Sequence, residues 1–389
     1  MTYRVDPTFV DELKKYGHVN IEDCFNCGNC TAICPLSTSE TPFPRKNIRQ
    51  AQLGLRENLL ESVDPWLCYY CGECTLTCPR QAEPAEAQMA MRRWLTAQYD
   101  WTGLARKFYT SKVWEIGAVF FLAAFIVVTF VLFHGPIVTD HVALNTFAPV
   151  HLVELGDYVM LVGLSFFLLS NIFRMYLFIV RSDKSLKIPF KLYITEAWQL
   201  LYNTVTQIRY AKCDEEEGQS FWEKTRWRNH LIIVSGYGLM FTLVVVFLRW
   251  FQTDNYYPIW HPQRWLGYYA TIALLFGAGD AIIGRIKKDN EMHKYSHPSD
   301  WMFPILLLLT AFTGILLHTF RYLGLPLPTY YTYVIHLAIL TPMLVLEVPF
   351  GKWAHLAYRP FAIYFEAIKE KAKVLQESQT TADAYAAAD

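Results

Sequence analysis

Long apolar stretches alternate with polar segments over the last three quarters of the chain. Each of six stretches is long enough, or nearly so, to cross a hydrocarbon core of about 30 Å at about 1.5 Å per residue. A water-soluble core would not need so many such runs, so the pattern predicts six membrane-spanning helices. They are expected at Val113–Phe133, Leu152–Val180, Leu231–Phe251, Trp265–Ile286, Met302–Phe320 and Tyr333–Phe350.

The polar segments carry helical patterns, so we expect an all-α fold in three parts. An N-terminal domain at 1–105 contains short helices, a six-span membrane domain follows at 106–360, and a tail covers 361–389. The small, polar end of that tail, Gln376–Asp389, predicts disorder. Between the second and third spans, Lys187–Tyr210 has the pattern of an amphipathic helix. This helix either lies on the membrane surface or packs on the N-terminal domain.

The basic residues are distributed unevenly between the two sides of the predicted membrane domain. The connection Arg181–Arg228 carries nine Lys and Arg residues, and the connection after the fourth span carries four more. The segments His134–Val150 and Gln252–Gln263 carry none. Basic loops stay on the cytoplasmic side. Because the number of spans is even, we expect a multi-pass protein of the cytoplasmic membrane with both termini in the cytoplasm.

Composition adds the chemistry. The net charge of zero gives no reason to expect a nucleic-acid partner. Eight of the nine cysteines form two runs, Cys24–Pro35 and Cys68–Pro79, each with the C-x2-C-x2-C-x3-C-P spacing of a two-cluster ferredoxin. Cys213 is left over, and we expect an ordinary thiol there. Such clusters need reduced thiolates, which favours a cytoplasmic N-terminal domain. The first 20 residues lack the apolar core of a cleavable signal peptide.

The spacing also predicts how the cysteines are shared, because in two-cluster ferredoxins the fourth cysteine of each run ligates the other cluster. We therefore expect two [4Fe–4S] clusters. The ligands of the first would be Cys24, Cys27, Cys30 and Cys78, and those of the second Cys68, Cys71, Cys74 and Cys34.

Five histidines fall at the ends of the predicted spans, where polar groups are costly unless they are used. His230 and His355 belong to the cytoplasmic ends, so they form the natural pair for one b-type haem. His336 belongs to the outer end and is expected to hold a second haem, with His318 or His151 as its partner.

The stretch from Tyr333-Val-Ile-His336 to Val348-Pro-Phe-Gly-Lys-Trp-Ala-His355 resembles the last helix of the nitrate reductase gamma subunit family, which has a histidine at each end. Asn229-His230 matches the first helix-bound histidine of that family. The family's second histidine on that helix corresponds to a position near Met240 here, so Met240 stays open as an outer ligand.

The cysteine domain resembles the helical ferredoxin domains of heterodisulfide reductase C subunits and fumarate reductase iron–sulfur subunits. Over roughly residues 15–365, its fusion to a gamma-like cytochrome b resembles the C subunits of the quinone-interacting membrane-bound oxidoreductases of sulfate reducers. That resemblance implies electron transfer from menaquinol to flavin-containing A and B subunits, related to the A subunit of heterodisulfide reductase. It also implies adenylylsulfate reductase as the downstream acceptor in sulfate respiration.

A quinone site needs hydrogen-bonding groups and a proton route within the membrane. The carboxylates Glu347 and Asp157 are our candidates, and Glu154, Asp280, Asn171 and Arg174 are further polar residues on the spans. The sequence does not choose between quinol oxidation and quinone reduction.

Three alternatives stay open. One is the membrane subunit of a heterodisulfide-reductase-like complex, whose disulfide site would lie on a partner because only Cys213 is spare. Another is a haem-free iron–sulfur membrane anchor. The third is an electron conduit fed by an external cytochrome.

Overall fold

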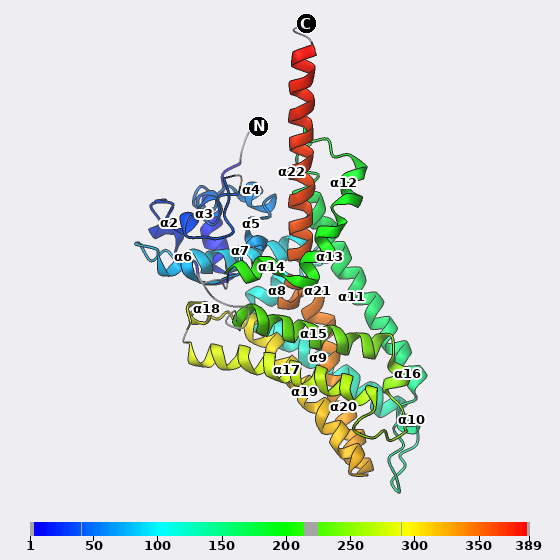
Figure 1. The fold of residues 1–389 in the computed structure, drawn as a ribbon. Helices are drawn as coiled ribbons and strands as arrows, with labels where there is room; N and C mark the ends of the chain where they lie inside the picture. The colour runs from blue at the N-terminus through cyan, green and yellow to red at the C-terminus, as the bar shows by residue number, and fades with distance from the viewer. Residues whose placement is uncertain (1–3, 40, 214–224, 289, 387–389) are drawn as a thin grey trace.

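The structure is a computed structural model that describes residues 4–39, 41–213, 225–288 and 290–386. The described residues contain helices and no strands, so the predicted all-α fold is confirmed. A head made of the N-terminal residues lies above a slanted bundle of long helices, and the last helix, α22, rises beside the head (Figure 1). The head and the end of α22 therefore lie at the same end of the molecule.

The head is built from short helices around one long helix, α7, which is buried on almost every side. Pro84 at the start of α7 has the fixed φ that suits a first helical turn, and alanines follow at close spacing. Phe9, Trp66, Trp94 and Tyr99 fill the core around this helix. The helices of the head are α1 (Phe9–Lys14), η1 (Ile21–Asp23), α2 (Asn29–Ala32), α3 (Arg45–Gln52), α4 (Arg56–Leu60), α5 (Asp64–Leu67), α6 (Glu73–Leu76), α7 (Pro84–Tyr99) and α8 (Leu104–Thr110).

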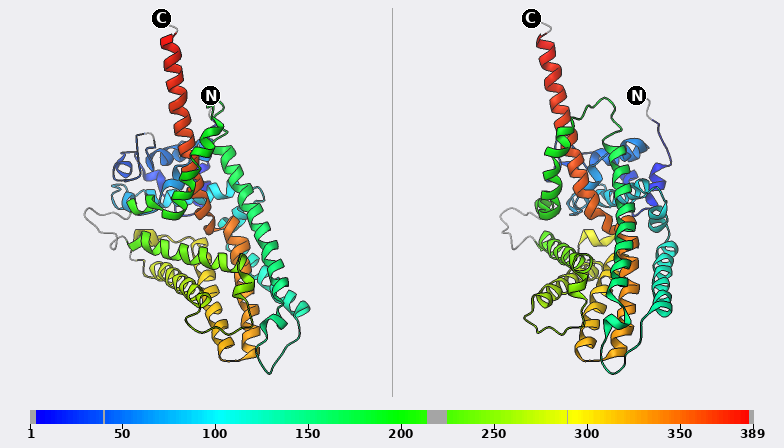
Figure 2. Two further views of the ribbon diagram at one scale, coloured as in Figure 1. Left: turned by 45° about the vertical axis from the view of Figure 1, so that its right-hand side comes forward. Right: turned by 90° about the vertical axis from the view of Figure 1, so that its right-hand side faces the viewer.

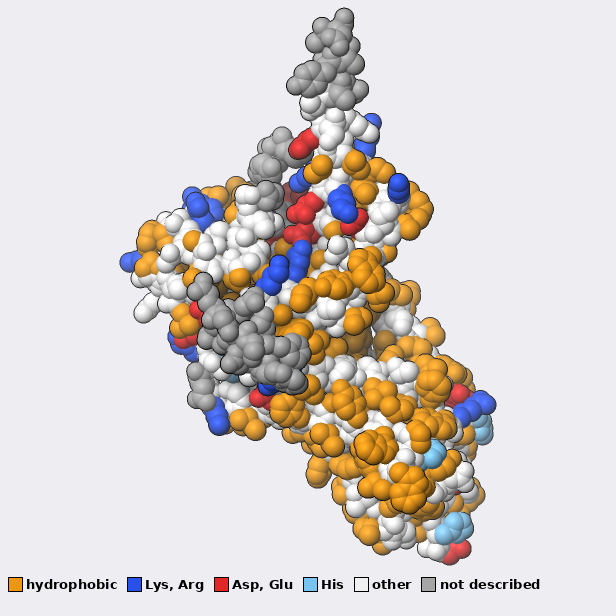
Figure 3. All heavy atoms as spheres, in the orientation of Figure 1, with side chains coloured by type: hydrophobic (Ala, Val, Ile, Leu, Met, Phe, Trp, Pro, Cys, Tyr) orange, Lys and Arg blue, Asp and Glu red, His pale blue; other side chains and the backbone are white. Residues whose placement is uncertain are grey.

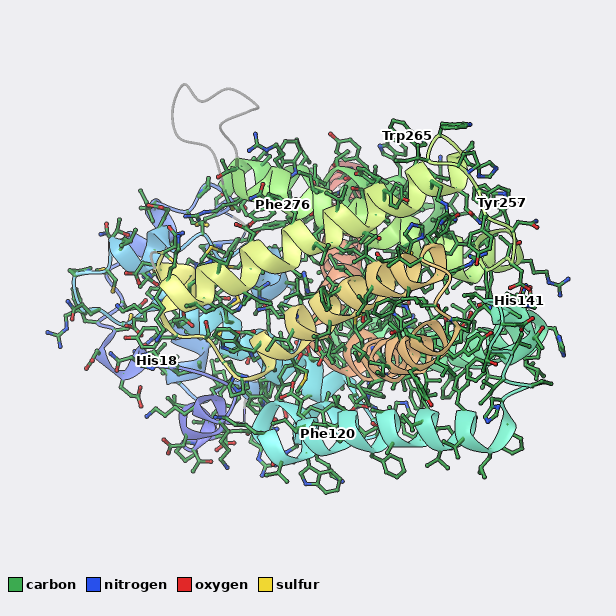
Figure 4. The ribbon with its side chains drawn as sticks, turned by 90° about the horizontal axis from the view of Figure 1, so that it is seen from below. His18, Phe120, His141, Tyr257, Trp265 and Phe276 are labelled. Atoms are coloured by element: carbon green, nitrogen blue, oxygen red, sulfur yellow. The ribbon has the colours of Figure 1, made fainter. Side chains whose placement is uncertain are left out.

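Six helices of the described residues are long and apolar enough to cross a membrane, as the sequence predicts. Their outer faces are apolar over a broad surface (Figure 3). Phe120 and Trp265 lie at the periphery of the bundle and are 70% and 67% exposed (Figure 4). Such a surface suits lipid rather than water. The six are α9 (Lys112–Phe133), α11 (Val150–Ile179), α15 (Thr225–Val245), α17 (Pro262–Lys287), α19 (Ser299–Tyr322) and the segment Pro326–Phe350.

Two of the spans differ from the prediction. The third ends at Val245, and a separate short helix, α16 (Leu248–Phe251), follows it. The sixth is not one regular helix: α20 (Pro326–Pro342) leads into a π-helical turn, η2 (Met343–Glu347), and a last turn, α21 (Val348–Phe350). Pro342 lies at this junction and has no N–H to donate, and such π-turns are frequent at functional sites.

The short helices between the spans cover the two ends of the bundle. Below the head, the long helices α15 and α17 run side by side and cross the other spans of the bundle (Figure 2). The remaining short helices are α10 (Leu144–Phe147), α12 (Phe190–Thr195), α13 (Ala197–Thr206), α14 (Ile208–Cys213), α18 (Glu291–Lys294) and η3 (Lys352–Ala354).

The amphipathic segment that forms α12–α14 packs on the last helix, α22 (His355–Ala386). Lys371 of α22 binds Glu196 at 2.6 Å, and Arg209 binds Glu366 at 2.9 Å. The apolar residues Trp198, Leu201 and Val205 of the amphipathic segment stay exposed. The segment therefore joins α22 through ion pairs and keeps an apolar face exposed, and its position on a membrane surface stays a prediction. Since α22 is helical to Ala386, the structure differs from the disorder expected after Gln376.

Buried ion pairs join the head to the membrane helices. Asp300 at the start of α19 binds Arg93 of α7 and Lys352 of η3, each at 2.7 Å. Arg174 of α11 donates to the backbone carbonyl of Tyr99 at 2.8 Å. Loss of one partner would leave a buried charge uncompensated, so these contacts favour the arrangement of the head against the bundle.

Candidate iron–sulfur and histidine sites

The two cysteine runs adopt the same local conformation. Asn26 and Gly28 have φ values of 67° and 91°, and the equivalent Tyr70 and Gly72 have 61° and 94°. Each glycine starts a short helix that carries the third cysteine of its run. The N–H of Asn26 donates to Cys24 Sγ, and that of Tyr70 to Cys68 Sγ, both at 3.4 Å. N–H groups that point at sulfur stabilise a thiolate, which is the form that iron binds.

The fold brings the fourth cysteine of each run to the other run. Cys34 interacts electrostatically with Cys68 and Cys71, and all three line one cavity together with Cys74. Cys30 interacts in the same way with Cys24, Cys27 and Cys78. Asn29 of α2 also donates to the carbonyl of Thr77 at 2.9 Å, which ties the two runs together.

Burial raises the pKa of the Cys30 and Cys34 thiols to about 11 each. Sulfurs in such surroundings become thiolates only when a cation compensates their charge. A cluster iron provides that cation, so the residues present fit the two [4Fe–4S] clusters that the spacing predicts.

The sequence did not predict where Cys213 lies in the fold. The end of α14 carries it into the cavity of Cys34, Cys68, Cys71 and Cys74, where its thiol is hydrogen-bonded to Cys71. Around it, Tyr210 stacks on Tyr69 with ring centres 5.1 Å apart. No local sequence signal could have predicted this contact, because it depends on how α14 folds back against the head.

His230 and His355 face each other at the end of the bundle next to the head, with ring centres 6.0 Å apart. His230 Nδ1 lies 2.6 Å from Gln207 Oε1, and His355 Nδ1 is bonded to the carbonyl of Lys352. Metal-bound histidines characteristically use one ring nitrogen for such an anchor and leave the other for the metal. Burial holds the pKa of His355 well below its usual range, so this ring is neutral and able to ligate.

The spacing of this pair agrees with a shared iron. Bonds of about 2 Å from each imidazole to one metal separate the two nitrogens by about 4 Å, and hence the ring centres by about 6 Å. A cavity of about 200 Å³ adjoins both rings and extends to Tyr69 and Tyr70 of the second cysteine run. The inner pair predicted from sequence is thus brought together, and its residues fit a haem.

The outer histidines do not form such a pair. His336 of α20 binds Thr313 Oγ1 through Nδ1 at 2.9 Å, whereas both nitrogens of His318 are engaged, by Arg264 at 2.9 Å and Tyr268 at 3.0 Å. His151 is exposed at the start of α11, and Met240 packs in the core of the bundle. Among the described residues, no ring contact joins His336 to another histidine.

The two carboxylate candidates lie in different places. Asp157 lines a cavity of about 230 Å³ between α9, α11 and α20, and its Oδ2 is buried without a hydrogen-bond partner among the described residues. Glu347 accepts a hydrogen bond from the backbone N–H of Lys352 at 3.0 Å, at the turn that precedes His355. The other polar candidates on the spans all have partners. Glu154 binds Arg249, and Asp280 accepts from Asn229. Asn171 donates to the carbonyl of Pro349, and Arg174 donates to the carbonyls of Tyr99 and Gln98.

Comparison with known proteins supports the cysteine domain. Residues 20–82 match the model of the 4Fe–4S dicluster domain family. A protein of Archaeoglobus profundus that is described as like the C subunit of heterodisulfide reductase is 36% identical over 112 residues, which are 28% of this chain and 59% of that protein. The C subunit of the H(2):CoB-CoM heterodisulfide, ferredoxin reductase of Methanothermobacter marburgensis is 36% identical over 64 residues, 16% of this chain and 34% of that subunit. No solved structure matches the chain.

The chain therefore spans about a third to three fifths of the length of these relatives. Together with the six long apolar helices, these matches identify an iron–sulfur electron-transfer protein related to the C subunit of heterodisulfide reductase, and point to a multi-pass membrane protein.

Proposed function

We propose that this chain is the membrane subunit of a respiratory quinone-interacting oxidoreductase. In this proposal it takes electrons from menaquinol, carries them across the membrane domain with two b-type haems, and delivers them through two [4Fe–4S] clusters to soluble flavoprotein subunits. The chain lies in the cytoplasmic membrane with both termini in the cytoplasm, and the complex serves adenylylsulfate reduction.

The observation that carries the proposal is the pair His230 and His355. Each ring is anchored through Nδ1, the rings are separated by the distance that a shared iron requires, and they lie at the end of the bundle that contacts the head. A b-type haem supplies single-electron steps, which a two-electron quinol donor needs in order to reduce one-electron clusters.

The second cluster is the point of entry to the head in this proposal. Tyr69 and Tyr70, between two of its cysteines, line the cavity that also borders His230 and His355. The first cluster is closer to the outside, because Cys27 is exposed whereas Cys71 is half-buried. Electrons therefore leave from the first cluster.

The soluble partner docks beside the first cluster. Phe25 lies between Cys24 and Cys27 and is 61% exposed, and Leu76, on the helix that packs against α2, is exposed to a similar extent. Apolar side chains that surround an exposed redox centre suit an electron-transfer contact with another protein. We take the partners to be flavin-containing A and B subunits, both like the A subunit of heterodisulfide reductase.

Quinol is oxidised at the cavity of Asp157, near the outer end of the bundle. Quinol oxidation releases two protons with its two electrons, so it requires a proton acceptor. The Asp157 carboxylate is buried, has an oxygen without a described partner and adjoins apolar and aromatic walls, as a quinol ring needs. Leu337, which follows His336 in the chain, lines the same cavity, so the site adjoins the proposed outer haem.

A second candidate function follows from the names of the relatives. The chain would then be the membrane subunit of a heterodisulfide-reductase-like complex, with the disulfide chemistry on a partner chain. A separate alternative is a haem-free iron–sulfur membrane anchor, which predicts no Soret band in the purified complex.

The decisive experiment adds a menaquinol analogue to the purified complex and records reduced-minus-oxidised spectra. We expect b-type bands to appear at once, followed by the EPR signals of reduced clusters. A complex without b-type bands would favour the haem-free anchor. Intact haem that the analogue does not reduce would favour an external donor.

A further inference from the structure

Arg92 of α7 is a buried cation without a carboxylate partner in the part of the chain that the structure describes. Its side chain is 8% exposed, its Nε has no hydrogen-bond partner there, and its guanidinium bonds to Met89 Sδ. No carboxylate of the described residues pairs with it, since the nearby Asp300 binds Arg93 and Lys352 instead. Buried arginines are rare unless they are paired, because an isolated charge loses its hydration without compensation.

A second arginine lies in the same cavity as Arg92. Arg359 of α22 lines the same cavity of about 200 Å³, and it donates to the neutral carbonyls of Trp66 and Cys68, each at 3.1 Å. Burial, and then the proximity of Arg359, lower the pKa of Arg92 to about 9. The cavity thus holds three guanidinium groups, those of Arg92, Arg285 and Arg359, that form no ion pair with a carboxylate of the described residues.

The cavity has one acidic residue among its described lining residues, and that residue is already used. Asp300 is bound to Arg93 and Lys352, so its charge is compensated twice over. Cys68, an expected ligand of the second cluster, is the described group whose negative charge favours that of Arg92, and a carboxylate for Arg92 and Arg359 would have to come from outside the described residues. His230 and His355 line the same cavity.

We propose that Arg92 and Arg359 form a carboxylate cradle, which binds the propionate groups of the porphyrin that His230 and His355 hold. This inference rests on the haem assignment made above. A guanidinium is suited to this task, because its planar fork binds a carboxylate through two parallel hydrogen bonds. Arg92, whose Nε has no described partner, would bind in this way, and Arg359, whose Nε and Nη2 already donate to carbonyls, would add a single bond from Nη1.

The carboxylate cradle would also orient the porphyrin, because it fixes where the edge that carries the propionates lies. Arg359 follows His355 by four residues, so both side chains lie on one face of α22. The guanidinium of Arg359 bonds to the carbonyl of Cys68 and lies 4.0 Å from the ring centre of Tyr69. A carboxylate bound there faces the second cluster, so one arginine links the haem pocket with a cluster ligand.

The test is a redox titration of the purified complex, followed by optical spectroscopy, for Arg92→Leu and the conservative Arg92→Lys. Loss of a positive charge beside the haem disfavours its reduced form, so Arg92→Leu should lower the ratio of reduced to oxidised inner haem about tenfold at a fixed potential. Arg92→Lys should preserve most of this ratio. Arg249→Gln, which removes an arginine that pairs with Glu154, serves as the matched control and should change nothing.

The outcomes separate the two proposals. If His355→Ala removes one haem but Arg92→Leu leaves the haem potential unchanged, the cradle is wrong and the haem assignment stands. If His355→Ala leaves the haem content unchanged, the haem assignment itself is wrong. A third result would also overturn the cradle: an inner haem potential that depends on phosphate concentration in the unmodified complex, and not in Arg92→Leu, would show that a free anion occupies the site. Cluster EPR signals of normal intensity in each variant would confirm that the head is folded.

Discussion

The two ends of the membrane bundle carry histidines in similar numbers and use them differently. At the inner end, His230 and His355 converge from two helices, each with one nitrogen anchored and the other available. At the outer end, His336 has a single anchor, whereas His318 is bonded through both nitrogens to Arg264 and Tyr268. The depth of a histidine along a span is therefore a weaker guide than the bonds that its second nitrogen makes.

The difference also extends to charge. The inner end has a cavity with buried arginines that lack acidic partners among the described residues, whereas the outer cavity is apolar and holds the buried carboxylate of Asp157. An arginine-lined cavity attracts carboxylates, and an apolar cavity with one carboxyl group suits a neutral molecule that releases protons. This contrast agrees with the proposed function, in which anchoring and electron exit belong to the inner end and quinol chemistry to the outer end.

Removal of an inner ligand should have the largest effect. His355→Ala should abolish the inner haem, because one remaining imidazole does not retain a b-type haem that is not covalently attached. The haem content per protein, measured as the pyridine haemochrome, should fall by half if two haems are present. His318→Ala is the matched outer variant. A larger loss from His318→Ala than from His355→Ala would reverse the comparison.

Asp157→Asn tests the chemical role of the outer end. The amide preserves shape but cannot accept a proton, so we expect the rate of haem reduction by a menaquinol analogue to fall about 100-fold in stopped-flow measurements. Glu154→Gln, on the same helix as Asp157, disrupts the ion pair with Arg249; it is the control and should change the rate little. Equal rates in the Asp157→Asn variant and the parent would move the quinol site elsewhere.

The anchors of the ligands allow a matched pair of variants. Gln207→Leu removes the acceptor of His230 Nδ1, and Thr313→Val removes the partner of His336 Nδ1. Each should weaken haem retention at its own end about tenfold, because an unanchored ring is a poorer ligand. Haem loss to an excess of apomyoglobin, resolved by the spectra of the two haems, measures this. A loss at the wrong end in either variant would contradict the assignment.

Cys213→Ala should have the smallest effect. All eight expected ligands remain, so the iron content should be unchanged. The S–H that bonds to Cys71 is lost, and hydrogen bonds to cluster sulfur raise its reduction potential. We therefore expect a few-fold shift toward the oxidised second cluster at a fixed potential in EPR-monitored titrations, with Cys213→Ser closer to the parent. Loss of the cluster in Cys213→Ala would instead identify Cys213 as a ligand.

The sequence predicted what depends on local spacing and hydropathy. The two-cluster domain, the helical fold and the six long apolar helices are confirmed, because cysteine spacing and apolar run length follow directly from the chain. The proximity of His230 and His355 follows from their positions at span ends, and their role as haem ligands stays a prediction.

What the sequence could not predict depends on tertiary contacts. The place of Cys213 depends on how α14 folds against the head, and the isolation of Arg92 emerges only when every surrounding carboxylate of the described residues is known to be elsewhere. The break after Val245 has no proline or glycine signal near it. The outer partner of His336 was left open in the sequence because several residues share its depth, and the described residues give it no neighbouring histidine.

The ion pairs of Asp300 have a consequence for the order of synthesis. The head precedes the membrane helices in the chain, but Arg93 of the head binds Asp300, which is translated much later, and Lys352, the other partner of Asp300, follows later still. Roughly 200 residues separate the end of the head from Asp300. At a translation rate of about 5–20 residues per second, Asp300 is therefore made about 10–40 s after the head. During that interval the loop of Cys68 and Cys71 is not yet covered by α22, whose Arg359 donates to the carbonyl of Cys68. Iron and sulfide can therefore reach the second cluster before the membrane domain closes over it.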